Sequence, residues 1–184
     1  MAIELSAFHH QLPIVETAAA PGASNAVKPQ RSRQFTWSSE TDTQRFAGQL
    51  AALPALGQAF VALHGDLGAG KTTLVRHLLQ ALGVQGRIKS PTYAVVESYP
   101  LPELTVWHFD FYRFSDPREW EDAGFRDIFA SPGLKLAEWP EKAAGLLPVA
   151  DLEICLLTDA DETRAVTLRA GTDLGLQLLG ALPE

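Results

Sequence analysis

The chain has 184 residues, 46% of them hydrophobic, and a formal net charge of −7. This length predicts one domain with some tail, and the composition excludes a fibrous or wholly disordered protein. An acidic body opposes binding to a phosphate backbone, so we expect no tight hold on RNA or DNA by the chain alone. The single cysteine, Cys155, lies in an apolar run, where we expect a buried hydrophobe in a protein of the reducing cytoplasm.

The N-terminal stretch has little that can pack. Residues 17–34, TAAAPGASNAVKPQRSRQ, are rich in Ala, Pro, Gly and Ser, and the first residues have neither a basic leader nor a sustained apolar stretch. We therefore predict a mobile extension over residues 1–33 and one folded domain over 34–184. No apolar run approaches the roughly 20 residues that a membrane span needs, so we expect no membrane partner.

The first half of the folded part is predicted to be a helix, a strand and a second helix. The first helix begins with Ser39 or Thr41 as its cap and ends before Pro54. An apolar strand ending at His64 then leads into a glycine loop. The amphipathic helix after the loop stops at Gly83.

The second half is predicted to contain five strands and three short helices. The strands are expected at 92–99, 103–114, 133–139, 151–157 and 164–170. The helices are expected at 116–124, at 140–148 and at 173–182. The last two strands are joined by the polar turn TDADET and should form a hairpin. The alternation predicts an α/β fold whose central, largely parallel sheet is flanked by helices and has an antiparallel edge hairpin.

The glycine loop carries the clearest chemical signal. Residues 65–72, GDLGAGKT, match the phosphate-loop pattern G-x-x-x-x-G-K-[ST] at every fixed position, between an apolar strand and an amphipathic helix. Glycines let backbone N–H groups close on anionic oxygens, and the following helix directs its positive end to the same point. We predict a P-loop NTPase in which Lys71 bridges the β- and γ-phosphates and the Thr72 hydroxyl ligates Mg²⁺. The residues expected to contact the phosphates are Asp66, Gly68, Ala69, Gly70, Lys71, Thr72 and Thr73.

Metal and water need a second acid at the end of a neighbouring strand. Asp110 ends the run TVWHFD and Glu138 ends the run LKLAE, within the strands expected at 103–114 and 133–139. One such carboxylate alone often faces solvent, but two beside a phosphate loop favour catalytic and metal-binding roles. Which of them contacts the metal directly stays open. The turn KSPTY presents the hydroxyls of Ser90 and Thr92, which suits a γ-phosphate sensor or, alternatively, a plain turn into a strand. His108 is expected to be a packed strand residue.

The nucleotide is expected to be ATP, because the guanine-reading sequence [NT]-K-x-D does not occur. A small-molecule kinase stays an alternative, although arginines form no cluster that would serve as a lid over the phosphates. A second alternative is an adaptor that ATP binding assembles without hydrolysis.

Taken together, these motifs resemble those of the bacterial TsaE family, also called YjeE. HGDLGAGKTT, KSPTY, HFDFYR, GFRDIF and LAEWPEK follow the family's order and approximate spacing, from about Phe35 to Arg169. The resemblance implies a small Mg²⁺-dependent ATPase that binds the proteins TsaB and TsaD. It would couple ATP hydrolysis to their complex, which makes threonylcarbamoyladenosine in tRNA, so tRNA would be an indirect partner. Turnover without the partners should be slow, because no in-built arginine finger is evident.

The resemblance also implies roles for individual residues. Lys71, Asp110 and Glu138 would be catalytic, and Thr72, Glu138 and Asp110 would serve the metal. The remaining matches are Ser90 and Thr92 in a Ser-Pro-Thr loop, Trp139 in a Glu-Trp-Pro element, and Thr41 near the base.

Overall fold

The computed structural model describes residues 32–183 except 160 and 162, so most of the extension predicted at 1–33 lies outside the described residues. The first strand, β1, spans Ser32–Trp37, and therefore Ser32 and Arg33 belong to the folded domain. The guanidinium of Arg33 donates hydrogen bonds to the carbonyl oxygens of Leu179 and Leu182, at 3.2 and 2.7 Å. The beginning and the end of the described chain are thereby tied together.

Seven strands form one sheet in the order β1-β7-β6-β2-β5-β4-β3. The other strands are β2 (Phe60–His64), β3 (Val96–Pro100), β4 (Thr105–Asp110), β5 (Leu134–Glu138), β6 (Leu152–Thr158) and β7 (Arg164–Ala170). The four central strands β6, β2, β5 and β4 are parallel, whereas β7, β1 and β3 run antiparallel to their neighbours. The predicted α/β P-loop fold with a largely parallel centre is confirmed, and the β6–β7 hairpin lies one strand in from the edge.

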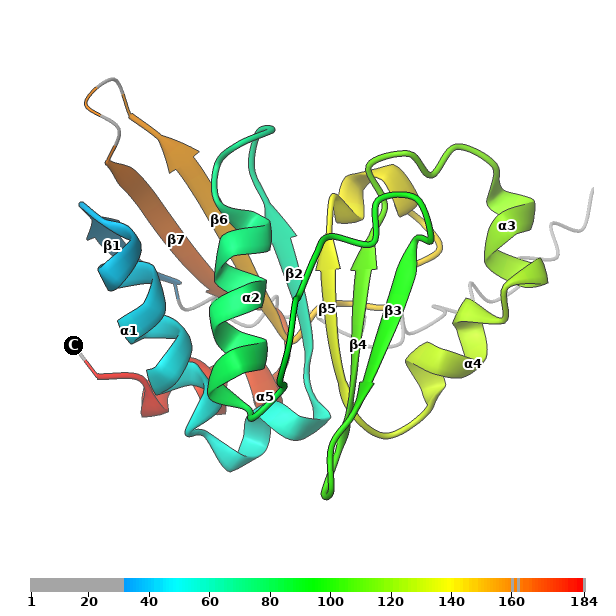
Figure 1. Ribbon diagram of the computed structural model, residues 1–184, viewed down its shortest axis with the longest axis horizontal. Helices are drawn as coiled ribbons and strands as arrows, with labels where there is room; N and C mark the ends of the chain where they lie inside the picture. Colours follow the sequence, from blue (N-terminus) through cyan, green and yellow to red (C-terminus); the bar gives the residue numbers. More distant parts are fainter. Residues whose placement is uncertain (1–31, 160, 162, 184) are drawn as a thin grey trace, which may run out of the picture.

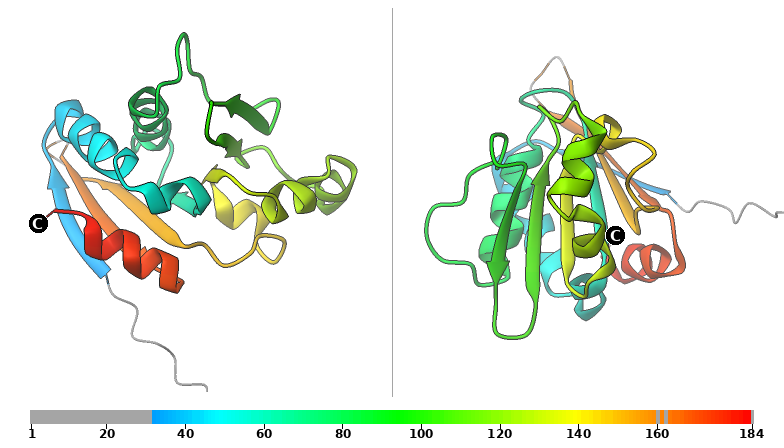
Figure 2. Two further views of the ribbon diagram at one scale, coloured as in Figure 1. Left: turned by 90° about the horizontal axis from the view of Figure 1, so that it is seen from below. Right: turned by 90° about the vertical axis from the view of Figure 1, so that its right-hand side faces the viewer.

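Helices cover the sheet on both sides (Figures 1 and 2). They are α1 (Glu40–Ala51), α2 (Lys71–Ala81), α3 (Pro117–Asp122), α4 (Phe125–Ala130) and α5 (Asp173–Ala181), with 3₁₀ turns η1 (Pro54–Gln58) and η2 (Pro140–Ala143). Of the two caps predicted for α1, Ser39 is the one present: it accepts from the N–H of Asp42, whose carboxylate accepts from the N–H of Ser39. None of the described helices is long and apolar enough to cross a membrane.

Several local elements differ from the sequence prediction. β1 has no counterpart among the predicted elements, β4 ends at Asp110 rather than at residue 114, and the helix predicted at 140–148 is only the 3₁₀ turn η2. The strand predicted at 92–99 begins only at Val96, because the preceding residues form a turn. In that turn the N–H of Val95 donates to the Pro91 carbonyl at 2.7 Å, and Val95 has a φ of +64°. The helix predicted to stop at Gly124 is followed directly by another, since Gly124 is the left-handed residue (φ +67°) between α3 and α4.

The core has two parts, one on each face of the sheet. Val61 and Leu63 of β2 pack with the leucines of α1 and α2. Phe60 and Ala62, which alternate with them, pack on the other face with aromatic residues of α3 and α4. Because the four central strands are parallel, their carboxyl ends lie at one edge of the sheet, where β2 passes into α2 (Figure 1).

Candidate functional site

The phosphate loop is the turn between β2 and α2. Gly65 (φ +138°) lies so close to β6 that a Cβ there would be 2.4 Å from the carbonyl oxygen of Leu156. Gly70 (φ +106°) is the N-cap of α2, so the free N–H groups of the first helical turn face the loop. The Nζ atom of Lys71 donates to the carbonyl oxygens of Gly65 and Asp66, at 2.5 and 2.9 Å. The loop is therefore closed around its own lysine.

Lys71 is buried beside an aromatic ring. The residue is 4% exposed, and its Nζ lies 3.9 Å from the centre of the Trp139 ring. Burial lowers the pKa of Lys71, while the nearby carboxylates of Glu138, Glu141 and Asp110 oppose this shift. Trp139 is held in the left-handed conformation (φ +58°) directly after β5. A buried ammonium facing a ring and a loop of N–H groups is suited to an anionic ligand.

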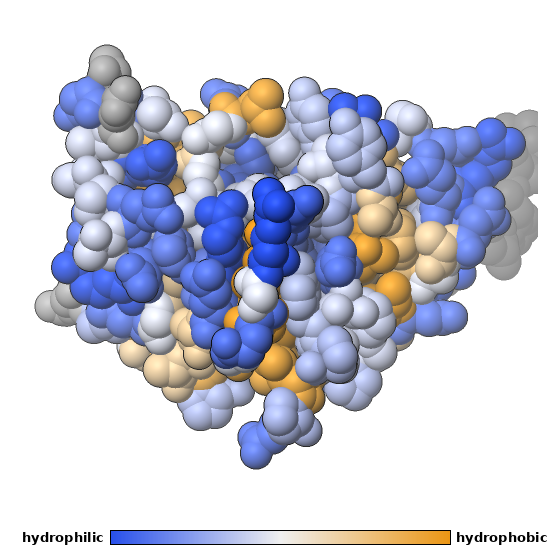
Figure 3. Space-filling view, in the orientation of Figure 1, coloured by the Kyte–Doolittle hydropathy of each residue, from blue (hydrophilic) through white to orange (hydrophobic). Residues whose placement is uncertain are grey.

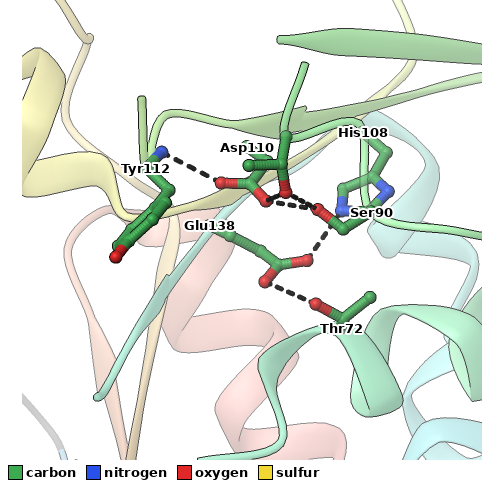
Figure 4. Close-up of polar contacts among 7 residues, drawn as sticks. Thr72, Ser90, His108, Asp110, Tyr112 and Glu138 are labelled. Carbon is green, nitrogen blue, oxygen red and sulfur yellow. Dashed lines mark hydrogen bonds and ion pairs between the residues drawn. The ribbon is translucent and has the colours of Figure 1, made fainter. Parts of the chain in front are cut away.

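Glu138 and Thr72 lie against each other at the mouth of the loop. The Thr72 hydroxyl, in the first turn of α2, donates to Glu138 Oε2 at 2.8 Å. His108 Nε2 lies 2.9 Å from Glu138 Oε1, so both carboxylate oxygens are engaged (Figure 4). Glu138 and His108 are buried, and His108 Nδ1 has no hydrogen-bond partner among the described residues. The expectation of a packed histidine holds, with one addition: its ring contacts a candidate catalytic acid.

Asp110 has different partners. Its Oδ2 atom accepts from the hydroxyls of Ser90 and Thr92, the latter at 2.6 Å. Its Oδ1 atom accepts from the N–H of Tyr112 at 2.9 Å. Asp110 and Glu138 are paired residues on the neighbouring strands β4 and β5, so the two carboxylates face the same space (Figure 4). The turn with the two hydroxyls is therefore attached to one acid, and the helix α2 to the other.

A cavity of about 360 Å³ unites these groups. Its lining residues are Leu67, Gly68, Gly70, Lys71, Thr72, Thr73, Ser90, Thr92, Asp110, Tyr112, Glu138 and Trp139. Most of the site residues predicted from the sequence thus lie around one space. Leu67 and Tyr112 also line it, although no motif had singled them out as site residues.

Three predicted site residues are not among the cavity-lining residues. Asp66 is exposed and reaches the site through its carbonyl group, which accepts from Lys71. Ala69 is buried, and its carbonyl oxygen accepts from Arg164 Nε at 3.0 Å. Thr41 is exposed in the first turn of α1. Arg164 comes from β7, and no sequence signal connects it to the loop.

The donor set fits magnesium. Within residues 32–159, 161 and 163–183, no three His, Cys, Asp or Glu side chains are grouped to hold a metal ion. Mg²⁺ is commonly held by one or two carboxylates together with phosphate and water oxygens. The adjacent hydroxyl of Thr72 and carboxylate of Glu138 are oxygen donors of this kind, beside the loop where phosphates would lie.

Comparison with known proteins identifies the family. The model of the family described as "Threonylcarbamoyl adenosine biosynthesis protein TsaE" matches residues 37–166. The chain belongs to the TsaE family. The resemblance seen in the sequence motifs is thereby confirmed.

Individual TsaE proteins match most of the chain. The tRNA threonylcarbamoyladenosine biosynthesis protein TsaE of Haemophilus influenzae is 44% identical over 138 residues, which are 75% of this chain and 87% of that protein. The Bacillus subtilis protein of the same name is 33% identical over 140 residues, with the same coverage of 75% and 87%. In fold, the chain is similar to the crystal structure of Bacillus subtilis YdiB, with a TM-score of 0.68 and 24% identity over 82% of this chain and 93% of that one.

Proposed function

We propose that this TsaE-family chain is a cytoplasmic, Mg²⁺-dependent ATPase in the biosynthesis of threonylcarbamoyladenosine in tRNA. Its hydrolysis of ATP would serve a complex of TsaB and TsaD, and tRNA would be reached only through that complex. One observation carries the proposal: Thr72, Glu138 and Asp110 converge on the same cavity as the phosphate loop. A phosphate loop alone binds nucleotide, whereas hydrolysis needs acids for metal and water beside it.

The phosphates are assigned to the loop and to Lys71. Main-chain N–H groups from Gly68 to Thr73 and the ammonium of Lys71 would surround the β- and γ-oxygens. Because Lys71 is buried, its charge acts in a medium of lower dielectric and stabilises negative charge more strongly than it would in water. Asp66 and Ala69 contribute through the main chain.

Magnesium is assigned to Thr72 and Glu138, which would hold it directly. When bound, Mg²⁺ neutralises charge on the phosphate oxygens. Asp110 is assigned to the metal through water, because its oxygens accept from Ser90, Thr92 and the Tyr112 N–H, whereas Glu138 contacts the hydroxyl of Thr72 that is itself assigned to the metal. The two hydroxyls on Asp110 would orient the attacking water. Trp139 packs on Lys71 and keeps bulk water from the site.

Thr41 is assigned a position near the base of the bound ATP. It lies in the first turn of α1, a helix that is joined to α2 by the contact between Glu40 Oε1 and His77 Nε2 at 2.8 Å. Thr41→Ala should weaken ATP binding. It should not change the free energy of unfolding, because Ser39 and not Thr41 is the cap of α1. Equal ATP affinity of this variant and the native chain, measured by calorimetry, would remove Thr41 from the site.

The decisive experiment is steady-state ATP hydrolysis with magnesium, with and without TsaB and TsaD. We expect slow turnover alone and faster turnover with the pair, because the cavity lining contains no arginine. An arginine supplied by a partner accelerates such reactions by about 10³–10⁵-fold. Fast turnover that the pair leaves unchanged contradicts the proposal.

Two other outcomes distinguish the alternatives. Transfer of labelled γ-phosphate to a metabolite would identify a small-molecule kinase. If Glu138→Gln and Asp110→Asn both bind ATP and still support tRNA modification, the chain is an adaptor that does not need hydrolysis.

A further inference from the structure

A second hollow lies on the opposite face of the sheet, between β3 and α3. It measures about 430 Å³. Its lining residues are Ala94, Val95, Val96, Glu119, Asp122, Ala123 and Phe125. We call this hollow the β3–α3 groove. Figure 3 shows apolar surface there, beside the polar surface of α3.

The groove lies at the start of an edge strand, because Val96, the first residue of β3, is among its lining residues. β3 is the last strand in the sheet order, and within the described part of the chain only β4 pairs with it. Its outer main-chain N–H and C=O groups can therefore accept an added strand. Val96 lies at the start of β3 and contributes an apolar side chain to the groove.

The other side of the groove carries unpaired negative charge. On α3 and its cap, Asp116 is paired with Arg118 at 2.6 Å, and Glu121 lies 3.8 Å from Arg126. Glu119 and Asp122, the two acids that line the groove, have no ion-pair partner among the described residues. An acidic rim over an apolar floor disfavours RNA and favours a cationic partner.

We propose that the β3–α3 groove binds an extended segment of a partner protein. Apolar side chains of that segment would cover Val96, Ala123 and Phe125, and its Lys or Arg side chains would pair with Glu119 and Asp122. The inference rests on the proposed function for the identity of the partner, TsaB–TsaD, and extends it by naming the surface.

The groove is connected to the ATP site through one short segment. Thr92 donates to the carboxylate of Asp110 inside the cavity, and the carbonyl oxygen of Val95 accepts from the N–H of the same Asp110 at 2.9 Å. Ala94, Val95 and Val96 line the groove. A partner segment seated there restrains the residues that hold Asp110. Because such coupling is reciprocal, partner affinity should depend on whether ATP or ADP is bound.

The test measures binding of the purified TsaB–TsaD pair to the labelled full-length chain. The double variant Glu119→Lys with Asp122→Lys should bind the pair about tenfold more weakly, because two favourable charge contacts become repulsive. Its affinity for ATP and its hydrolysis without partners should equal those of the native chain. Ala123→Gln, which adds polar atoms to the apolar floor, should also weaken binding.

A matched control separates the groove from overall charge. Glu103→Lys with Glu153→Lys changes the formal charge equally at positions outside the groove and should bind like the native chain. Equal weakening in both double variants, or none in the groove variants, overturns the inference. A native dimer that the groove variant dissociates, seen by sedimentation, assigns the groove to a second copy and also overturns it.

The outcomes distinguish this inference from the proposed function. If the pair binds through the groove but leaves ATP hydrolysis unchanged, the proposed function fails and the inference stands. If the pair stimulates hydrolysis and the groove variants bind normally, only the inference fails. Absence of binding by the native chain overturns both. Slower hydrogen exchange of residues 94–96 in the complex is the expected structural sign of an occupied groove.

Discussion

Glu138 and Asp110 share one cavity but are held by different elements. Glu138 accepts from Thr72, at the start of α2, and contacts His108 behind it. Asp110 accepts from Ser90 and Thr92 in the turn before β3. This difference at the level of single side chains predicts different roles for two acids of the same charge and similar burial.

Glu138→Gln should therefore affect magnesium more than Asp110→Asn does. Loss of the carboxylate beside Thr72 should raise the magnesium concentration that gives half-maximal hydrolysis and lower the rate by about 10²–10³-fold. Asp110→Asn should lower the rate with a smaller change in magnesium dependence. Both variants should bind ATP. If Asp110→Asn raises the magnesium concentration for half-maximal hydrolysis more than Glu138→Gln does, then Asp110 and not Glu138 contacts the metal directly.

Lys71 gives a pH-dependent prediction. Burial lowers its pKa from the ordinary value of 10.5, so between the lowered pKa and 10.5 the unfolded chain binds more protons than the folded one. The free energy of unfolding should rise with pH in that window and should rise less in Lys71→Met. The pKa of Lys135 is also lowered by burial, but this contribution is common to both proteins and cancels in the difference. Urea unfolding of both proteins at several pH values up to 10.5 measures the two free energies of unfolding. An equal rise with pH in the native chain and in Lys71→Met contradicts the prediction.

The sequence predicts the roles of residues at fixed spacing in one motif better than the contacts of residues that meet across strands. Lys71 and Thr72 follow from the loop pattern, because their positions depend only on the local turn. The division of partners between Asp110 and Glu138 depends on their pairing in neighbouring strands, which no local pattern encodes. The contact of Arg164 with the loop joins residues 95 positions apart and has no local signal at all.

At the level of elements, the phosphate loop is fixed by its approach to β6. Gly65 has a φ of +138°, and a Cβ there would lie 2.4 Å from the Leu156 carbonyl oxygen. Gly68 also has a positive φ, +85°, but a Cβ there would meet nothing within 4 Å. A substitution at Gly68 therefore tests backbone strain alone, whereas one at Gly65 tests strain together with steric contact.

Gly68→Ala should lower the free energy of unfolding by about 1 kcal/mol, the effect of strain alone. Gly65→Ala should lower it by more than about 3 kcal/mol, because main chain of β6 must also move. Urea unfolding of both variants measures the difference. Equal effects would mean that the contact with β6 does not hold the loop.

The elements that sequence reasoning missed are those with mixed signals. β1 alternates exposed and less exposed residues, as a strand should, but the segment adjoins the Ser-rich start of α1. The turn before β3 contains Ala94 and Val95, residues with no turn preference, and the left-handed Val95 is held by Pro91 and Asp110. Long-range hydrogen bonds decide such segments, whereas α1 and α2 follow from caps and periodicity.

Across the whole molecule, the sheet separates two surfaces. On one side the start of α2 and the carboxyl ends of the parallel strands line the candidate site; on the other lies the β3–α3 groove. The turn before β3 is shared by both. In the proposed function, this arrangement gives a small protein a nucleotide site and a partner surface without a second domain.

The balance of charge over the whole chain predicts how tRNA is reached. With 15 Lys and Arg against 22 Asp and Glu, the chain offers phosphates little net attraction, and Lys71, the cation of the candidate site, is buried. We expect no binding of labelled tRNA by the chain alone tighter than about 10⁻⁴ M at physiological salt, the weak limit of non-specific binding. With TsaB and TsaD present, the chain should join the tRNA complex, as measured by fluorescence anisotropy. Tight tRNA binding by the chain alone, weakened steeply by salt, would mean that a basic surface outweighs the net charge and that contact with tRNA is direct.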